Sequence, residues 1–393
     1  MNAPRNPYYA SVAASRTVAH HQAALMRAVD RLAATMPVIG LRNPKIGKPD
    51  LTWDYCNGPD WVMSFQSGQL WLAYQLTGDP VFRESAQARR PGFRAVLQNR
   101  KARDHDLGFQ FSLSAVADWR MTGAEVARDM GLRAAEALAA RFNEAGHYIQ
   151  AWNPPGPHNR ERAAFVQGRA IVDTMQNLAL LHWAFRETAV EDFREIALLH
   201  ADTTRRHLVR ADGTSFHTFV FDAADGRPLR GETHQGFADG SCWSRGQAWL
   251  IHGFAQTYVT TRDPADLETA RLLAATAERL MGEDRVPVWD YALTDGETRW
   301  RDSSAGAIMA AGLYILAGVT EAEEAARWRG FADRLIDGLI ADCDLTANPA
   351  AQGLLGQGAA HVTAGRSNTM LPYGDYYYME ALMRSLGHDS FFW

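Results

Sequence analysis

One helical pattern recurs along this chain and restricts its fold more than any other feature. Apolar residues return about every 3.6 positions, an aromatic side chain follows, and a polar stop such as Thr-Gly-Asp ends the stretch. The pattern occurs at residues 70–79, 115–125, 180–192, 254–264 and 313–324. A second amphipathic stretch rich in Ala and Leu follows each stop. The repeating unit is therefore predicted to be a helical hairpin.

The spacing of the stops predicts five or six such hairpins in one domain. The stops recur at roughly 45 to 75 residues, which suits one helix pair per unit with loops of variable length. Strand signals are sparse, and the best is a short β-hairpin around an Asp-Gly pair in residues 215–229. Although 393 residues exceed the usual size of one core, no linker divides the chain. We expect a single all-α domain over residues 1–393, with residues 1–20 as a flexible extension.

Composition and charge exclude several kinds of partner. The chain is 47% hydrophobic and 22% charged, has a formal net charge of -5, and carries no basic run. These values are typical of a packed globular protein and give no electrostatic footprint for nucleic acid or an anionic membrane. No apolar signal segment precedes the first amphipathic stretch, so neither export nor a membrane anchor is expected.

The three cysteines indicate a reducing compartment. Cys56, Cys242 and Cys343 are odd in number, far apart and without metal-ligand spacing. Such cysteines are typical of buried free thiols, so we expect a cytoplasmic protein with no metal and no cofactor.

Tryptophan is abundant, and many of its 12 copies lie in Gly-rich loops at helix ends. The loop tryptophans are Trp53, Trp61, Trp152, Trp243, Trp249 and Trp289. Aromatic faces stack on the C–H faces of a sugar ring while neighbouring polar groups fix its hydroxyls. Any one of these residues could equally serve packing, so their clustering beside Asp, His, Gln and Arg is what predicts a sugar pocket.

Two aspartates are the best candidates for acid–base chemistry. Asp106 ends the group Asp104, His105 and Asp106, which precedes a Gly turn and an apolar run. An acidic residue at that place is often a helix cap, but three adjacent titratable groups also suit catalysis or an anionic substrate. Asp173 follows an apolar pair and lies one helical turn before Asn177. Burial there predicts a raised pKa suited to a general acid, with a structural Asp bonded to backbone as the alternative.

The densest polar segment, residues 230–254, enters a helix with several candidate binding groups. Arg245 lies there among aromatic and small residues, and a guanidinium binds a planar carboxylate through two hydrogen bonds. An acidic sugar is therefore predicted, with an internal ion pair of Arg245 as the alternative. Asp302, before an Ala-rich helix, is expected to be an N-cap, and Tyr373 is expected to serve packing.

Several segments together resemble the unsaturated glucuronyl hydrolases, glycoside hydrolase family 88. They keep the family order, and they include HDLGFQF, AIVDTMQNLALLHWA, RGETHQGFADGSCWSRGQAWLIHGFA, VPVWDY, RDSSAGAI and YGDYYYMEALMR. The run from HQG to SRGQAW is long, and no single segment carries the likeness. The resemblance implies an (α/α)6 barrel, six inner and six outer helices, that acts on oligosaccharides with a 4,5-unsaturated uronic acid at the non-reducing end.

The resemblance also implies roles for individual residues. Asp173 would match the acid/base residue, which protonates C4 of a vinyl ether and then activates the water that adds at C5, and Asp106 would be its essential partner. The residues implied to hold the unsaturated uronate are His217, Gln235, Arg245 and Trp249, and those implied to line the pocket are His105, Phe109, Trp152 and Trp243.

Two stretches depart from the family pattern. Gln66 stands where a stacking Trp is expected, and residues 154–169 are longer than expected before the Asp173 helix, which would reshape the entrance. Three rival functions also stay open. They are an unsaturated rhamnogalacturonyl hydrolase acting on pectin fragments, an inverting glycosidase with Asp106 and Asp173 as base and acid, and a non-catalytic sugar-binding protein.

Overall fold

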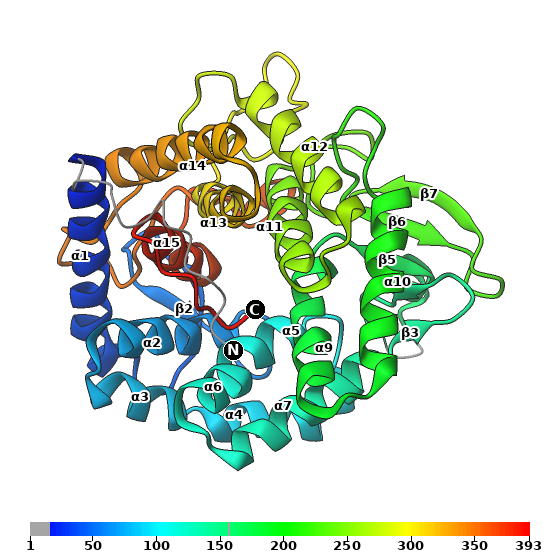
Figure 1. Ribbon diagram of the computed structural model, residues 1–393, viewed down its shortest axis with the longest axis horizontal. Helices are drawn as coiled ribbons and strands as arrows, with labels where there is room; N and C mark the ends of the chain where they lie inside the picture. The colour runs from blue at the N-terminus through cyan, green and yellow to red at the C-terminus, as the bar shows by residue number, and fades with distance from the viewer. Residues whose placement is uncertain (1–15, 156–157) are drawn as a thin grey trace.

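The computed structural model describes residues 16–155 and 158–393, and within them the helices form two concentric rings (Figure 1). The inner ring consists of α2 (Met63–Thr77), α5 (Leu107–Phe111) with α6 (Ala117–Thr122), α9 (Thr174–Thr188), α11 (Ser244–Thr261), α13 (Ser303–Val319) and α15 (Pro372–Ser385). The outer ring consists of α1 (Arg16–Ile39), α3 (Pro80–Gln87) with α4 (Arg90–Gln98), α7 (Glu125–Ala139), α10 (Glu191–His207), α12 (Pro264–Met281) and α14 (Ala322–Asp342). The predicted all-α, single-domain (α/α)6 barrel is confirmed.

The inner ring closes because each of its helices packs on two neighbours. Contacts run from α2 through α5, α9, α11, α13 and α15 back to α2, and α1 covers the outer side of α15. An inner helix is surrounded by other helices, so it needs no polar face. Every residue of α13 from Ser303 to Ala317 is buried. An outer helix buries only a stripe, which in α14 includes Trp328, Phe331 and Leu335.

Gly312 sets the spacing between two inner helices. A Cβ at this position of α13 would lie 2.7 Å from the Cα of His252 on α11, well inside van der Waals contact. Glycine alone therefore permits this approach, and the apolar run of α13 can pack against the α11 backbone.

Small antiparallel sheets occupy the connections of the described chain. β1 (Pro44–Gly47) pairs with β2 (Trp53–Tyr55), β3 (Phe142–Asn143) pairs with β4 (Tyr148–Ile149), and β5 (Arg169–Ile171), β6 (Thr218–Phe221) and β7 (Pro228–Glu232) form one sheet in that order. The hairpin predicted in residues 215–229 is confirmed as β6 and β7. The sequence did not indicate β5, a buried strand of three residues that pairs with the other edge of β6.

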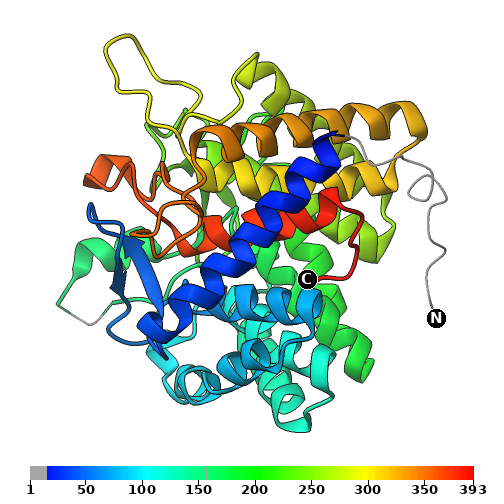
Figure 2. The same ribbon diagram turned by 90° about the vertical axis from the view of Figure 1, so that its left-hand side faces the viewer.

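Long connections gather at one end of the barrel. Figure 2 shows the β1–β2 hairpin, the short helix α8 (Arg160–Val166) and the loop before α15 together on the left side of that view. Turns from inner to outer helices are short, as at Gly78 between α2 and α3. Because most inner helices start from a long connection, the N-termini of the inner helices meet at the loop-bearing end.

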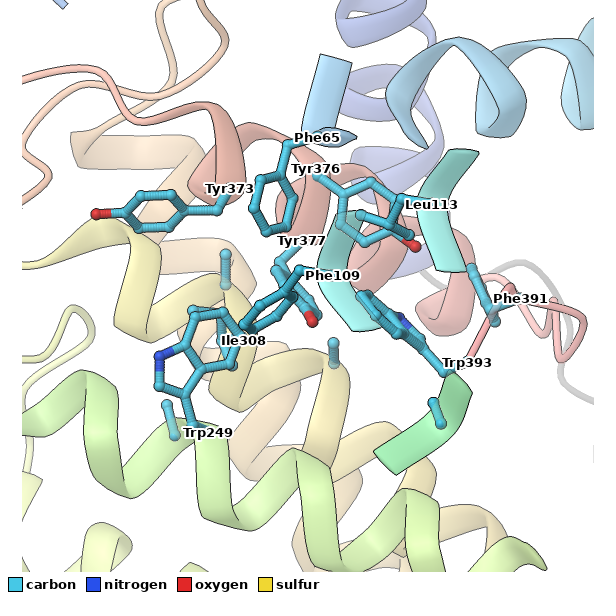
Figure 3. Packing of buried hydrophobic residues seen from close by; sticks show 14 of the residues in the cluster. Phe65, Phe109, Leu113, Trp249, Ile308, Tyr373, Tyr376, Tyr377, Phe391 and Trp393 are labelled. Atoms are coloured by element: carbon cyan, nitrogen blue, oxygen red, sulfur yellow. The ribbon is translucent and has the colours of Figure 1, made fainter. Parts of the chain in front are cut away.

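Aromatic side chains fill the centre of the barrel. Figure 3 shows Phe65, Phe109, Trp249, Tyr377 and Trp393 among them, and we call these five residues the aromatic cluster. Ring centroids of Phe109 and Trp249 lie 5.1 Å apart, and Trp393 stacks on Tyr377 at 5.8 Å. Phe109 belongs to α5 and Trp249 to α11, so the cluster packs against the N-terminal parts of both helices.

Two further expectations concern the N-terminus and the thiols. Helix α1 begins at Arg16, so the predicted flexible extension is wrong for residues 16–20, and residues 1–15 lie outside the described residues. The three cysteines are free, with Cys242 and Cys343 buried and Cys56 partly buried. Within residues 16–155 and 158–393, no helix is long and apolar enough to cross a membrane.

Candidate active site

The chemically distinctive residues lie where inner helices begin. Asp106 directly precedes α5, Asp173 precedes α9, Trp243 precedes α11 and Asp302 precedes α13. Tyr373 is the second residue of α15. A helix N-terminus carries a partial positive charge and free N–H groups, so the loop-bearing end of the barrel favours a bound anion.

Two of these aspartates keep their carboxyl groups free of their own helices. The carboxyl group of neither Asp106 nor Asp173 accepts a hydrogen bond from the first turn that follows it. Asp302 instead accepts from the backbone N–H groups of Ser304 and Ala305, so its predicted N-cap role is confirmed. The cap interpretation that the sequence left open for Asp106 is therefore wrong.

A tight contact between α5 and α9 fixes the two free aspartates relative to each other. Oδ1 of Asn177 accepts a hydrogen bond from the backbone N–H of Phe109 at 2.6 Å, and its Nδ2 donates to the carbonyl of Asp173 at 3.2 Å. A Cβ on Gly108 would lie 2.2 Å from the Cα of Asn177, so only glycine allows this approach. Asn177 therefore connects the helix start that carries Asp106 with the one that carries Asp173.

Asp106 lies in a buried, acidic environment. Burial raises its pKa most, and the charges of Asp104, Asp173 and Asp60 raise it further, against a hydrogen bond from Asn177 that lowers it. The resulting pKa is well above the usual carboxyl range. Asp106 therefore tends to keep its proton in the ligand-free protein.

His105 is the immediate neighbour of Asp106 and carries no charge. Burial lowers the pKa of the His105 ring to about 3. Its Nε2 lies 3.4 Å from Oδ2 of Asp106, and its Nδ1 lies 3.2 Å from Oγ1 of Thr174, the first residue of α9. A neutral imidazole can donate one hydrogen bond and accept another, so His105 connects Asp106 to α9 without neutralising the carboxyl.

Asp173 has the opposite protonation preference. Burial raises its pKa, but nearby His217, His105 and Arg245 together outweigh burial and lower the pKa below its usual value. The raised pKa that the sequence predicts from burial is therefore wrong for the ligand-free protein. The apolar residues before Asp173 indicate its burial. They do not show that His217, His105 and Arg245, which come from other segments, act on its carboxyl group.

His217 has a defined tautomer in the site. Its Nδ1 accepts hydrogen bonds from the backbone N–H groups of His234 and Gln235, at 3.2 and 3.1 Å. The proton of a neutral ring is then on Nε2, which lies 3.7 Å from Oδ2 of Asp173. Neither atom has a hydrogen-bond partner among the described residues. His217 is therefore oriented to donate toward Asp173 or toward a molecule bound beside it.

The two carboxyl groups differ in protonation, since Asp106 keeps its proton and Asp173 is a carboxylate in the ligand-free protein. Asp106 is 7% exposed and Asp173 is 9% exposed, so both are largely shielded from water. Environments that push two carboxyl pKa values apart are typical of paired groups with different catalytic roles. This arrangement can donate one proton and accept another during hydrolysis.

Arg245 forms the internal ion pair that the sequence left as the alternative. Its Nη1 bonds to the Asp302 carboxylate and donates to the carbonyl of Ala359 at 2.7 Å, while Nη2 donates to the carbonyl of Ala360 at 2.8 Å. The Trp243 ring lies 4.3 Å from the guanidinium carbon. These contacts occupy most of the N–H groups that the predicted carboxylate fork requires. Arg245 is thus a buried positive charge, held by Asp302 and two carbonyl groups, that acts on Asp173.

The side chains of the other predicted binding residues differ in their exposure to solvent. Trp152 and Gln235 are partly exposed, and the Gln235 side chain donates to the carbonyl of Ala360 at 2.8 Å. Trp243 is buried against His217, with ring centroids 4.2 Å apart. Trp152 contacts His105 and Trp243 contacts His217, so both are connected to the aspartates through a histidine, although most of their surface is covered.

Phe109 and Trp249 are placed differently from the prediction. Both are fully buried in the aromatic cluster, so neither ring forms part of an accessible pocket wall (Figure 3). Gln66, which replaces an expected Trp, is also buried, and its Nε2 has no hydrogen-bond partner in the described part of the chain. These three residues line the interior of the barrel.

Tyr373 is buried and packed as the sequence analysis predicts, with its ring stacked on Trp61 at 4.9 Å between centroids, and it also borders the site. Its ring lies 5.3 Å from the guanidinium carbon of Arg245. Burial raises the pKa of its hydroxyl, the charge of Arg245 lowers it, and the charges of Asp302 and Asp173 raise it again. The sequence alone does not indicate the contact with Arg245, because Tyr373 follows a proline in a segment rich in aromatic residues.

Comparison with known proteins identifies the family. Residues 37–389 match the family described as Glycosyl Hydrolase Family 88. The chain belongs to glycoside hydrolase family 88. This family 88 chain is 39% identical over 369 residues to the unsaturated glucuronyl hydrolase of a Bacillus species, covering 92% of the chain and 96% of that relative. It is 32% identical over 346 residues to the unsaturated chondroitin disaccharide hydrolase of Streptococcus pyogenes, covering 87% and 85%.

The family 88 fold matches as well. The crystal structure of the Bacillus unsaturated glucuronyl hydrolase superposes with a TM-score of 0.87 at 37% identity, covering 93% of this chain and 96% of that one. The chain is thus a glycoside hydrolase, and the non-catalytic interpretation is wrong. The family assignment also does not support the rhamnogalacturonyl rival. Across the described ranges, no group of His, Cys, Asp and Glu is arranged to hold a metal ion.

Proposed function

We propose that this family 88 enzyme removes the 4,5-unsaturated uronic acid from the non-reducing end of oligosaccharides that polysaccharide lyases produce. The observation that carries the proposal is the pair of uncapped aspartates, Asp106 with a raised pKa and Asp173 with a lowered one. The names of its relatives support it, since they are an unsaturated glucuronyl hydrolase and an unsaturated chondroitin disaccharide hydrolase. The substrate would be a di- or oligosaccharide.

The reaction is a hydration of the C4=C5 double bond. Asp173 in its acid form gives a proton to C4, the π electrons form the new C4–H bond, and the ring oxygen stabilises the cation at C5. Asp173, now a carboxylate, removes a proton from a water molecule as the water oxygen bonds to C5. The resulting hemiketal opens to a C5 ketone, and the hemiacetal left at C1 releases the second sugar as an alcohol. One carboxyl thus serves first as acid and then as base.

Asp173 must first gain a proton, because its pKa is low in the ligand-free protein. The carboxylate of a bound uronate is a like charge beside Asp173, and such a charge raises a carboxyl pKa. Asp106 keeps its proton in the ligand-free protein, because its pKa is raised. Substrate binding would therefore shift the proton from Asp106 toward Asp173, so that acid forms only when the double bond is in place.

The same end of the barrel favours an anionic sugar. Helix N-termini converge there, and the buried charge of Arg245 acts on Asp173. His217 and His105 are neutral donors, since burial lowers the pKa of each ring below its usual value. A uronate carboxylate would meet positive potential from Arg245 and the helix ends, with His217 and Gln235 as neutral hydrogen-bonding neighbours.

An assay with an unsaturated hyaluronan or chondroitin disaccharide tests the proposal. Loss of the ultraviolet absorbance of the C4=C5 enoate reports turnover in wild type, Asp173→Asn and Asp106→Asn. We expect wild-type turnover, near-complete loss in Asp173→Asn and a large loss in Asp106→Asn. Retained activity in Asp173→Asn would rule out its acid/base role, and turnover of saturated glycosides alone would support the inverting rival.

We also propose that residues 1–393 form one catalytic domain that works in the cytoplasm. The free state of Cys56, Cys242 and Cys343 supports a reducing location.

A further inference from the structure

Helix α8 lies in the stretch of residues 154–169 that departs from the family pattern. Phe165 on this helix stacks on Trp152, with ring centroids 5.5 Å apart and planes inclined by 28°. The guanidinium carbon of Arg162 lies 5.2 Å from the centre of the Trp152 ring and 4.8 Å from that of Phe165. Asn159 caps the helix by accepting from the backbone N–H of Arg162 at 2.9 Å. The stretch therefore holds a cation over a pair of aromatic rings.

The aromatic pair contacts residues of the acid–base centre through Trp152. Ring centroids of Trp152 and His105 lie 6.0 Å apart, and His105 contacts Asp106. His234, whose backbone N–H bonds to His217, lies 5.2 Å from Trp152 between ring centroids. Trp152 thus bridges the site and α8. Arg162 and His105 contact the same ring, so the second sugar of a disaccharide bound beside Asp106 would lie next to Arg162.

The charge of Arg162 has no counter-ion in the described chain. No carboxylate of residues 16–155 or 158–393 lies within ion-pair distance of its guanidinium. Arg169, the neighbouring cation, differs: it bonds to Glu232 at 2.6 Å, and Glu232 also accepts from Arg230 at 2.6 Å. A partly buried arginine on aromatic faces without an acidic partner is available to an anion from outside.

We propose that Arg162 is a specificity-determining residue that binds a sulfate ester on the sugar released by the reaction. The inference rests on the proposed function, because it assigns the second sugar of the same substrate. A guanidinium offers two parallel N–H groups to an oxyanion, and the Trp152–Phe165 pair fixes its plane. A neutral second sugar would leave this charge unpaired.

Binding measurements in the Asp173→Asn background test the assignment without requiring turnover. The probes are unsaturated uronyl-N-acetylgalactosamine disaccharides without sulfate, with 4-O-sulfate and with 6-O-sulfate, measured by isothermal titration. We expect at least one sulfated disaccharide to bind about tenfold more tightly than the unsulfated one, as one charge-assisted bidentate contact provides. Adding Arg162→Met should reduce that ratio to near one and leave the unsulfated affinity unchanged.

Arg160→Met is the matched control, because Arg160 is an exposed arginine on the same helix and lies over neither ring. It removes the same charge and should keep the sulfate preference, while Arg162→Lys should keep only part of it. An equal loss for sulfated and unsulfated ligands in Arg162→Met would show a packing role and overturn the assignment, as would no sulfate preference before mutation. Absent turnover by wild type with intact sulfate-selective binding would reject the proposed function alone.

Discussion

Asp106 and Asp302 occupy the same position, the residue before an inner helix, and only Asp302 caps the helix that follows it. Asp302 also pairs with Arg245 and is fully buried. The Asp106 side chain accepts no hydrogen bond from α5, and burial and the neighbouring carboxyl groups raise its pKa. An acidic residue before a helix is thus a helix cap at Asp302, whereas at Asp106 it is a free carboxyl group with a raised pKa.

Asp302→Ala should destabilise the protein strongly. The change removes a cap and leaves the buried Arg245 without its carboxylate, which costs about 3 to 5 kcal/mol for an unpaired buried charge. Urea unfolding followed by circular dichroism measures the change. Asp263→Ala is the control, since Asp263 is an exposed cap of α12 that accepts from Ala265, and it should cost about 1 kcal/mol. Equal losses in the two variants would contradict the assigned role of the ion pair.

Gly108→Ala should reduce activity more than stability. The added Cβ would clash with the Asn177 backbone and push α5 from α9, which displaces Asp106 relative to Asp173. A misplacement near 1 Å can lower turnover by about a hundredfold. Gly330→Ala on α14 is the control, because a Cβ there meets nothing within 4 Å and should be neutral or slightly stabilising. Near-normal kcat/KM in Gly108→Ala would refute the role of this contact.

Asp106→Asn should change the pH dependence of the reaction. Asp106 keeps its proton in the wild type because its pKa is raised, so kcat/KM should fall on the alkaline side only as Asp106 deprotonates, at a pH above the usual carboxyl range. The variant must take its proton from water onto Asp173, whose pKa is lowered. Its kcat/KM should therefore be greatest in acid and fall about tenfold per pH unit toward neutrality. An unchanged profile with uniformly lower rates would mean that Asp106 holds no catalytic proton.

Arg141→Met should loosen the loop that carries Asp106. The Arg141 side chain donates to the carbonyls of Arg103 at 2.9 Å and Ala151 at 3.1 Å, and so ties that loop to the segment before Trp152. We expect a lower kcat/KM and an alkaline limb at still higher pH, because a cation that stabilises the Asp106 carboxylate is lost. The kinetic pH profile is the measurement. Arg133→Met, on the exposed face of α7, should change neither, and equal effects of the two would reject the positioning role.

Much of the fold could be predicted from sequence because it depends on local periodicity. The polar stops after apolar stretches mark the turns from inner to outer helices, and Gly78 after Thr77 is an example. The strand β5 could not be predicted, since three buried residues carry no period of their own.

The site could be predicted only in part because its electrostatics are non-local. Asp106 and Asp173 stand out as candidates within their own segments. The pKa of Asp173 is set by His217 and Arg245, which come from other connections and were not visible as its neighbours. Arg245 likewise looked free for a carboxylate because Asp302, its partner, lies 57 positions away.

The most direct test of the account compares oxygen-linked and sulfur-linked phenyl glycosides of 4,5-unsaturated glucuronic acid. A hydration that starts at C4 leaves the C1 substituent untouched until after the chemical step, whereas an inverting glycosidase must protonate and expel that substituent directly. The account predicts that wild type consumes both at similar rates, with loss of the enoate absorbance, and that Asp173→Asn consumes neither. Turnover of the oxygen glycoside with an inert sulfur glycoside would contradict the assignment of Asp173 as the proton donor to C4.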